Sequence, residues 1–283
     1  MSQTIEPLPI VDLLRRHSLR ARKSLGQNFL VDEGALARIA AAAALTAADD
    51  VLEIGPGLGS LTRHLAQAAR RVVAVELDQT LLPALSDVLA PYANVQVVHG
   101  DILDLDPAAL MQGGAASGYK VVANIPYYIT SAVIRHLLEA TVRPTVVVLT
   151  IQREVAERLC ATPDDMSLLA VSVQAYARVE LVGRIAAGAF HPRPDVDSAV
   201  VRLTALAQPV FGDLNADRFF RVVKAGFSQK RKQLRNALGS GMSRPAQSVD
   251  AWLTHAGIDP KRRAETLSLE EWVRLAQGLD VSA

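Results

Sequence analysis

The sequence has very little of several features that define common protein classes. It contains one cysteine, Cys160, which excludes an internal disulfide and a zinc site built from several cysteines. Its six histidines are scattered, with no pair at ligand spacing on a common element, so we expect no metal site. The longest apolar stretch, Ile39 to Ala48, is short and alanine-rich, which favours a buried helix over a membrane span.

Targeting signals and an excess of charge are also missing. The first residues carry Glu6, Asp12 and prolines instead of a positive start followed by an apolar run, so the sequence predicts a cytoplasmic protein. The net charge of +1, as a whole-chain average, neither favours nor excludes a nucleic-acid partner. What the chain does have is apolar residues, half of its 283, which is ample for one large domain and a smaller one.

Short apolar runs alternate with amphipathic stretches over much of the chain. The runs are Val51–Ile54, Val72–Val75, Val95–Val98, Val121–Ala123 and Thr145–Leu149, and helical patterns begin near Ser60, Gln79, Pro107 and Thr130. Two further strand candidates, Arg178–Ile185 and Ser198–Thr204, would add an antiparallel hairpin at one edge. Because strands too apolar to alternate indicate a sheet covered on both faces, we predict an α/β, doubly wound Rossmann-like domain with a mostly parallel seven-stranded sheet.

The pattern becomes helical after Leu206. The predicted helices are Ala216–Phe227, Lys230–Leu238, Val249–His255 and Leu269–Gln277, with turns at Gly239-Ser240-Gly241 and Asp259-Pro260. We therefore predict three parts: a basic N-terminal arm over residues 1–32, the α/β domain over residues 33–206, and a small helical domain over residues 207–283.

A glycine-rich loop follows the first predicted strand, in Glu53-Ile54-Gly55-Pro56-Gly57-Leu58-Gly59. Glycines at alternate positions there let backbone approach a ligand at the carboxyl edge of a parallel sheet. The second strand ends at Glu76, 76 − 55 = 21 residues after the first glycine, where an acid can accept hydrogen bonds from both hydroxyls of a ribose. These features also fit a dinucleotide-binding dehydrogenase, but Ser60 stands where the third glycine of G-x-G-x-x-G would be.

A second acid follows the third strand. Asp101 can accept a hydrogen bond from an adenine amine, and Ile102 and Leu103 can pack on the ring. Considered alone, Asp101 reads as a helix cap, and Asp78 is expected to be only a cap. The order of the glycine loop, Glu76 and Asp101 favours the nucleoside interpretation for Asp101.

The fourth strand ends in Asn124-Ile125-Pro126-Tyr127. An adenine amine is a poor nucleophile because its lone pair is delocalised into the ring. The amide oxygen of Asn124 and a backbone carbonyl of Ile125 or Pro126 can each accept one amine proton, which exposes the lone pair to a methyl donor. Tyr127 can stack on the extruded base. The tetrapeptide therefore predicts methyl transfer to an adenine amine.

Two tracts are basic and free of acids, which suggests a phosphate-facing surface. The first lies within Leu13–Val31 and carries Arg15, Arg16, Arg20, Arg22 and Lys23. The second runs from Arg218 to Val249 and carries Arg218, Arg221, Lys224, Lys230, Arg231, Lys232, Arg235 and Arg244. Together they predict an RNA-binding protein.

On these residues the sequence resembles the ribosomal RNA adenine dimethyltransferase family over nearly the whole chain. The most specific motifs are the G-Q-N-F-L of the arm, N-I-P-Y and F-x-P-x-P-x-V-x-S-A, whereas the glycine loop is shared by many methyltransferases. The matching segments are Leu25–Leu30, Glu53–Gly59, Asp101–Leu103, Asn124–Tyr127, Gln152–Ala156, Phe190–Ala199, Phe227–Lys232 and Arg263–Ser268.

The resemblance implies S-adenosylmethionine as cofactor, no metal, and a role for each matching residue. The implied cofactor-binding residues are Asn28, Leu30, Gly55, Gly57, Glu76, Asp101, Ile102 and Asn124. The implied catalytic residues are Asn124, Pro126, Tyr127 and Phe190. Phe190 would form the second wall of the target-base slot, although a core phenylalanine is the competing interpretation. RNA binding is predicted for Arg22, Lys23, Lys230, Arg231, Lys232 and Arg235.

The function expected from the resemblance is dimethylation of two adjacent adenosines in a hairpin loop near the 3′ end of small-subunit (16S) rRNA. The expected partner is this rRNA within a pre-ribosomal particle, with no membrane involved and the enzyme acting as a monomer. Two alternatives stay open. One is methylation of a large-subunit rRNA adenine, as in the antibiotic-resistance branch, and the other is a chiefly structural ribosome-assembly factor.

Overall fold

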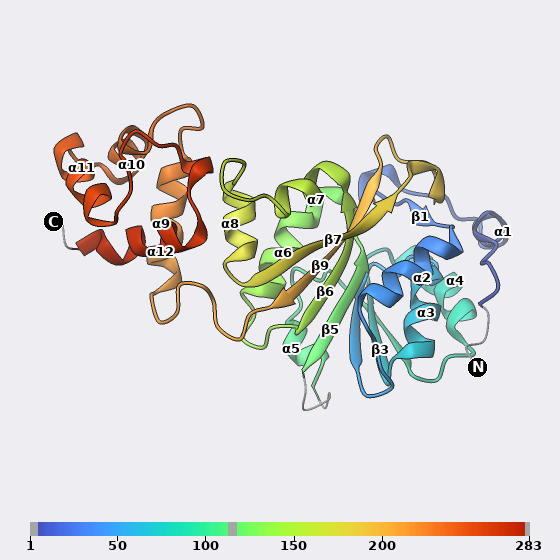
Figure 1. Ribbon diagram of the computed structural model, residues 1–283. Coiled ribbons are helices and arrows are strands. Elements are labelled where there is room, and N and C mark those ends of the chain that lie inside the picture. Colours follow the sequence, from blue (N-terminus) through green and yellow to red (C-terminus); the bar gives the residue numbers. More distant parts are fainter. Residues whose placement is uncertain (1–4, 113–117, 281–283) are drawn as a thin grey trace. The chain divides into compact units, whose positions relative to one another are not determined.

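The computed structural model describes residues 5–112 and 118–280 (Figure 1). These residues form two compact units. Unit 1 takes those within Met1–Ala156 and Glu180–Ala205, and unit 2 takes those within Glu157–Val179 and Leu206–Ala283. The segment Glu157–Val179 therefore packs in unit 2, whereas the sequence had assigned it to the α/β domain. Backbone amides of Asp164 and Met166 donate to the carbonyl of Glu265, which ties this segment to the C-terminal residues.

Unit 1 is built on a seven-stranded sheet of strand order β4-β3-β2-β5-β6-β9-β7. The strands are β2 (Asp50–Ile54), β3 (Arg71–Glu76), β4 (Val95–His99), β5 (Tyr119–Asn124), β6 (Val146–Gln152), β7 (Ala177–Ile185) and β9 (Ser198–Ala205). The pairs within β4-β3-β2-β5-β6 are parallel, and β9 is antiparallel to β6. The predicted mostly parallel sheet with an antiparallel edge is confirmed.

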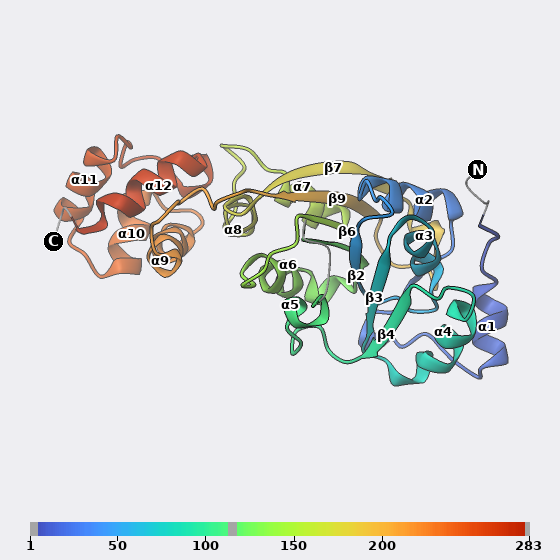
Figure 2. The same cartoon turned by 90° about the horizontal axis from the view of Figure 1, so that it is seen from below.

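Helices cover both faces of this sheet. They are α2 (Glu33–Ala42), α3 (Ser60–Ala68), α4 (Leu82–Leu89), α5 (Pro107–Leu110), α6 (Thr130–Leu138) and α7 (Arg153–Leu159). Figure 2 shows α2 and α3 on one side of the sheet and α5 and α6 on the other. Alternate residues of β6, Val146 and Val148, share a core cluster with Leu36 and Ile39 of α2, because side chains i and i+2 face the same side of a strand. Because β4, β3, β2, β5 and β6 are parallel, their carboxyl ends lie at the same edge of the sheet.

Residues 10–30 contain regular elements where the sequence predicted only a basic arm. Helix α1 (Ile10–Arg16) buries Leu13 and Leu14 in a cluster with Phe29 and Leu58. A short strand, β1 (Phe29–Leu30), then pairs antiparallel with β8 (Phe190–His191). The charged side chains on the other face of α1 concealed this apolar stripe, so the sequence predicted an arm. In the structure the stripe packs against Leu58 of the glycine loop.

Unit 2 is helical. Its helices are α8 (Leu168–Gln174), α9 (Ala216–Phe227), α10 (Leu234–Met242), α11 (Ala246–His255) and α12 (Leu269–Gln277). Helices α9 and α12 have the predicted bounds, but α8 was missed. The helix predicted at Lys230–Leu238 was wrong at both ends, and the turn predicted at Gly239-Ser240-Gly241 lies inside α10. A Cβ on Gly241 would come within 2.9 Å of the Ala225 backbone, so this glycine permits close packing of α10 on α9 and does not end the helix.

Short 3-10 helices complete the described chain. They are η1 (Lys23–Leu25), η2 (Gln79–Leu81), η3 (Tyr127–Ile129), η4 (Ala187–Ala189), η5 (Ala264–Thr266) and η6 (Gly278–Asp280). Among residues 5–112 and 118–280, no helix is both long and apolar enough to cross a membrane.

Candidate active site

A cavity lies in unit 1 where β2, β3 and β5 end, next to the segment that precedes β1. Leu103, which the sequence predicted to pack on the adenine ring, does not line it, but every other residue for which the sequence predicted a catalytic or cofactor-binding role does. These residues are Asn28, Leu30, Gly55, Gly57, Glu76, Asp101, Ile102, Asn124, Pro126, Tyr127 and Phe190. They come from positions up to 162 residues apart (190 − 28 = 162), and the parallel topology brings them together.

The glycine loop leaves no room for side chains at its centre. Gly57 has a φ of +60°, and a Cβ there would lie 3.1 Å from the ring of Phe29. Gly55 donates its N–H to the carbonyl of Val75 at 2.9 Å, and the nearest atom to a Cβ on Gly55 would be the carbonyl oxygen of Asn124, at 3.9 Å. The loop therefore runs as bare backbone between β3 and the end of β5.

Glu76 is held in place by backbone donors. Its Oε2 accepts from the N–H of Gly57 at 3.0 Å, and its Oε1 accepts from the N–H of Asp78 at 2.7 Å. Only 5% of Glu76 is exposed, and this burial raises the pKa of its carboxyl. A carboxylate has about four lone-pair positions, so about two remain for further donors from the cavity.

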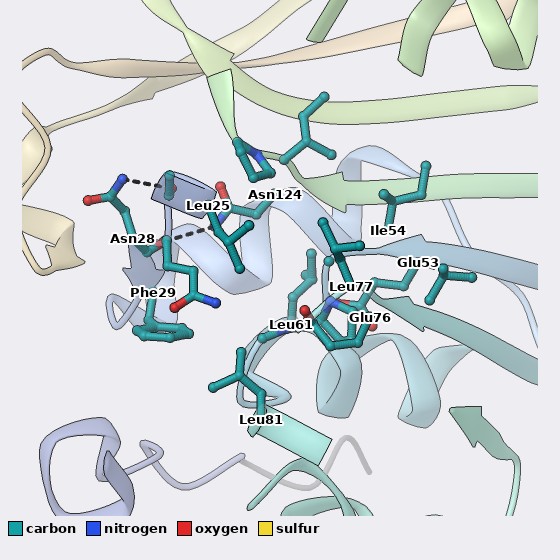
Figure 3. A pocket seen from close by; sticks show the side chains of 18 of the residues that line it. Leu25, Asn28, Phe29, Glu53, Ile54, Leu61, Glu76, Leu77, Leu81 and Asn124 are labelled. Carbon is teal, nitrogen blue, oxygen red and sulfur yellow. Dashed lines mark hydrogen bonds between the residues drawn. The ribbon is translucent and has the colours of Figure 1, made fainter. Parts of the chain in front are cut away.

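A second acid in the cavity, Glu53, was overlooked as a candidate. It is 1% exposed, its Oε2 has no hydrogen-bond partner among the described residues, and burial raises its pKa to about 8. Figure 3 shows Glu53 beside Glu76 on one side of the cavity. The signal was an acid among the apolar residues Val51, Leu52 and Ile54 of β2, directly before the glycine loop. At neutral pH this carboxyl is mostly protonated.

The amide of Asn124 is oriented by the segment before β1. Its Nδ2 donates to the carbonyl of Asn28 at 3.4 Å, and Asn28 Nδ2 donates to the carbonyl of Gly26 at 3.1 Å (Figure 3). Because the N–H2 group faces a carbonyl, the Oδ1 of Asn124 is the end of the amide that can accept. This is the polarity that the predicted chemistry requires.

Two aromatic residues line the cavity near Pro126. The hydroxyl of Tyr127 lies 2.7 Å from Ser198 Oγ, and burial raises the pKa of Tyr127, so the phenol stays neutral. Phe190 is 5% exposed and pairs with Leu30 between β8 and β1. It lines the cavity and also belongs to the hydrophobic core of unit 1, so the two interpretations of Phe190 are compatible.

Tyr128 also lines the cavity and was not considered from the sequence. It is 62% exposed, and its ring lies about 3.5 Å from where a Cβ on Gly26 would stand. Asp101 Oδ1 accepts from the N–H of Leu103 at 2.9 Å, as in a turn, while the residue still faces the cavity beside Ile102. Within the described ranges, no group of His, Cys, Asp or Glu side chains could hold a metal ion.

The predicted RNA-binding residues fall into two groups in different units. Arg22 lies 3.2 Å from Asp78, next to exposed Lys23, in unit 1. In unit 2 Arg235 lies 2.7 Å from Asp250. The remaining three residues are exposed in the turn between α9 and α10, and no carboxylate of the described chain pairs with them. They are Lys230, Arg231 and Lys232.

Comparisons with known proteins show which family the chain resembles. The sequence profile of ribosomal RNA adenine dimethylases matches residues 18–280. Ribosomal RNA small subunit methyltransferase A of Dehalococcoides mccartyi is 46% identical over 93% of this chain and 90% of its own length. The protein of the same name from Moorella thermoacetica is 44% identical over 99% of both chains.

Two solved structures share the fold. A crystal structure of the 23S rRNA methyltransferase ErmE superposes with a TM-score of 0.71 at 33% identity, over 89% of this chain and 100% of that one. A dimethyladenosine transferase from Plasmodium falciparum superposes with a TM-score of 0.75 at 24% identity, over 90% of this chain and 98% of that one.

Proposed function

The chain belongs to the ribosomal RNA adenine dimethylase family, and we propose that it methylates the exocyclic amines of two adjacent adenosines in a hairpin loop near the 3′ end of small-subunit (16S) rRNA. The observation that carries the proposal is the oriented amide of Asn124, placed in one cavity with Glu76 and the glycine loop. A primary amine to be methylated offers two N–H groups, and Asn124 presents an acceptor to one of them.

The cavity fits S-adenosylmethionine as the cofactor. When bound, S-adenosylmethionine supplies an electrophilic methyl group on a sulfonium. Glu76 would accept from the two ribose hydroxyls with the lone pairs that Gly57 and Asp78 leave free. Asp101 would accept from the adenine amine, with Ile102 against the ring. The bare backbone at Gly57, where a Cβ would meet the ring of Phe29, gives the cofactor room to approach the loop.

The residues of this chain would activate the target amine by accepting its protons. In the first transfer Asn124 Oδ1 would accept one N–H, and a backbone carbonyl at Ile125 or Pro126 would accept the other. In the second transfer the monomethylated amine has one N–H left, which one of these acceptors would take. The nitrogen then becomes more tetrahedral, and its lone pair leaves conjugation with the ring. Tyr127, anchored by Ser198, would stack on the extruded base with Phe190 behind it. Loss of a proton from the acidic methylated ammonium completes each transfer without a strong base.

The cavity alone cannot supply tight, selective RNA binding. Stacking contributes about 1–3 kcal/mol per base, and unstacking the target costs a few kcal/mol. We propose that the remaining RNA-binding free energy comes from Arg22 and Lys23 in unit 1 and from the basic turn of unit 2, which is Lys230, Arg231 and Lys232. The substrate would then be rRNA folded within a pre-ribosomal particle in the cytoplasm, met by a monomeric enzyme.

A large-subunit target is the second candidate, because the structurally similar ErmE at 33% identity is a 23S rRNA methyltransferase. Relatives at 44–46% identity carry the small-subunit name, which favours the first candidate. A chiefly structural assembly role would not require Asn124 and Glu76 to be held in one cavity by specific hydrogen bonds.

The test measures transfer of labelled methyl groups. Initial rates are compared on under-methylated small subunits, large subunits, free 16S rRNA and a loop oligonucleotide, and the product nucleotides are mapped. We expect dimethyladenosine at adjacent positions and the highest rate on small subunits. A higher rate on large subunits would favour the second candidate, and equal rates on all four substrates would refute the need for an assembled particle.

A further inference from the structure

We propose that Asp78 is a positioning residue that latches the segment Arg22–Asn28 over the cavity and so aligns Glu76 with Asn124. The latch consists of contacts within unit 1, and only its catalytic consequence rests on the proposed function. Asp78 is 3% exposed and does not line the cavity, so any effect on the site must pass through its neighbours.

A helix cap accounts for only half of the Asp78 carboxylate. Its Oδ1 accepts from the N–H of Thr80 at 3.1 Å and from Thr80 Oγ1 at 2.7 Å, as the expected cap of η2 does. Its Oδ2 instead accepts from Gln27 Nε2 at 2.8 Å, and Arg22 Nη1 lies 3.2 Å from Oδ1. Through Oδ2 and the ion pair with Arg22, Asp78 therefore contacts a segment that lies far away in the sequence: Gln27 and Asp78 are 51 positions apart (78 − 27 = 51).

Gln27 closes the segment on itself while Asp78 holds it. The side-chain Oε1 of Gln27 accepts from the backbone N–H of Arg22 at 2.8 Å, and the backbone N–H of Gln27 donates to the Arg22 carbonyl at 3.3 Å. The side-chain amide of Gln27 thus accepts from Arg22 and donates to the buried Asp78. Next to it, Gly26 packs so tightly that a Cβ would lie 3.1 Å from Pro126 Cβ.

The charge of Asp78 suits this role. Burial acts to raise the pKa of Asp78, but hydrogen bonds from Thr80 and Gln27 and the positive charge of Arg22 prevail, and the pKa is lowered. A buried, ionised acceptor makes stronger hydrogen bonds than a neutral one. At neutral pH Asp78 is therefore the ionised acceptor that these contacts require.

Two paths lead from Asp78 into the cavity. Its backbone N–H donates to Glu76 Oε1 at 2.7 Å, which orients the acid proposed to hold the ribose. The latched segment ends at Asn28, whose carbonyl accepts from Asn124 Nδ2 at 3.4 Å. The two sides of the cavity thus share one anchor. Opening the latch should weaken cofactor binding and slow methyl transfer together.

The test uses the full chain with the variants Asp78→Asn, Gln27→Ala and both combined. Asp78→Asn keeps the shape, but its amide cannot serve both Thr80 and Gln27 as acceptor. Thr80→Val is the matched control, because it removes a donor to the capping oxygen and leaves the latch oxygen alone. Two readouts need neither RNA nor turnover: tryptic cleavage after Arg22 and Lys23, and calorimetric affinity for S-adenosylhomocysteine.

We expect each latch variant to accelerate cleavage and to weaken S-adenosylhomocysteine binding by roughly 10-fold, the loss of one hydrogen bond to a charged group. The effect of the double variant should fall clearly short of the sum of the two single effects, since both remove the Gln27–Asp78 hydrogen bond and each removes only one contact of its own with Arg22. Thr80→Val should stay within about twofold. Additive effects, or cleavage at the wild-type rate in Gln27→Ala, would overturn the latch.

Folding and function are separated in the same series. If Asp78→Asn lowers the unfolding midpoint, the cleavage rate of Gln27→Ala decides the latch, because Gln27 itself lines the cavity and its S-adenosylhomocysteine affinity also reports direct contact. If the wild-type chain methylates no RNA, the proposed function fails while the cleavage and binding results still decide the latch.

Discussion

The cavity of unit 1 and the basic turn of unit 2 are built on opposite principles. In the cavity, Glu76, Asn124 and Asp78 each have partners at defined distances, and every contact constrains the next one. In the turn, the positive side chains of Lys230–Lys232 are exposed and pair with no carboxylate of the described chain. A single change in the cavity should therefore have a large, specific effect, whereas changes in the turn should act in small, additive steps.

The largest effect is expected from Asn124→Ala. Removing one acceptor aimed at the reacting amine should lower kcat by roughly 100-fold or more, by analogy with the loss of one oxyanion-hole donor. Cofactor affinity should fall much less than kcat, because the Asn124 amide is proposed to act chiefly on the target amine, and the loss of its bond to Asn28 accounts for the modest decrease. Single-turnover rates and calorimetry on the same preparation check both statements. A variant with near wild-type turnover would end the acceptor mechanism.

Glu76→Ala should come next, acting on the other side of the cavity. Loss of a charged acceptor for two hydroxyls should weaken S-adenosylmethionine binding by about 10- to 100-fold. Glu76→Gln keeps the shape and one acceptor, so its affinity for S-adenosylmethionine should lie between that of Glu76→Ala and that of the wild type. Unchanged affinity in calorimetry would remove Glu76 from the site.

Burial of an acid in the same cavity predicts a pH dependence of stability. Glu53 has a raised pKa of about 8 in the folded chain against 4.5 for an ordinary glutamate, so between these values the folded state holds a proton that the unfolded state releases. The contribution of Glu53 is fully present below pH 4.5 and is lost as pH rises toward 8, by about 1.4 kcal/mol per pH unit.

Glu53→Gln should abolish this slope. Its unfolding free energy, followed by circular dichroism in urea at pH 6, 7 and 8, should gain on wild type as pH rises. Glu139→Gln, at an exposed residue paired with Arg135, is the control for removing a carboxylate. Parallel profiles for Glu53→Gln and wild type would show that Glu53 is not protonated in the folded chain.

Much of the fold follows from the sequence because its signals are local. The predicted strands agree with the structure to within a few residues, since apolar runs bounded by polar residues define them. Helices α9 and α12 have the predicted bounds, and in the structure Asn215 and Ser268 cap them. Glycines mislead where the reason is tertiary: Gly241 resembles a helix stop, yet it lies where α10 meets Ala225.

The site divides in the same way. Residues whose chemistry is demanding, such as Asn124 before proline or Glu76 at a strand end, stand out in sequence and meet in the cavity. Gln27, in the segment before β1, and Asp78, just after β3, do not stand out in the sequence. An amide or an acid at such a position has many ordinary roles. Their pairing depends on α1 and β1 packing against the rest of unit 1, and the short apolar stripe of α1 does not specify which residues it will meet.

The smallest effects are expected in the basic turn, where they should also be graded. If Lys230, Arg231 and Lys232 each neutralise one phosphate, each alanine substitution should reduce the slope of log affinity against log salt by roughly 0.7–0.9, and the three should add. Arg235→Ala is the informative control, because Arg235 lies 2.7 Å from Asp250 and its charge is already balanced. It should change the slope by less than any of the three. Filter-binding titrations of small-subunit rRNA at several salt concentrations measure this, with cofactor affinity as the check that unit 1 is intact. An unaltered slope in the variant that combines the alanine substitutions of Lys230, Arg231 and Lys232 would mean that the turn does not face RNA. A larger change from Arg235→Ala than from Arg231→Ala would mean that RNA displaces Asp250, and that the partnered and unpartnered charges do not differ as their contacts indicate.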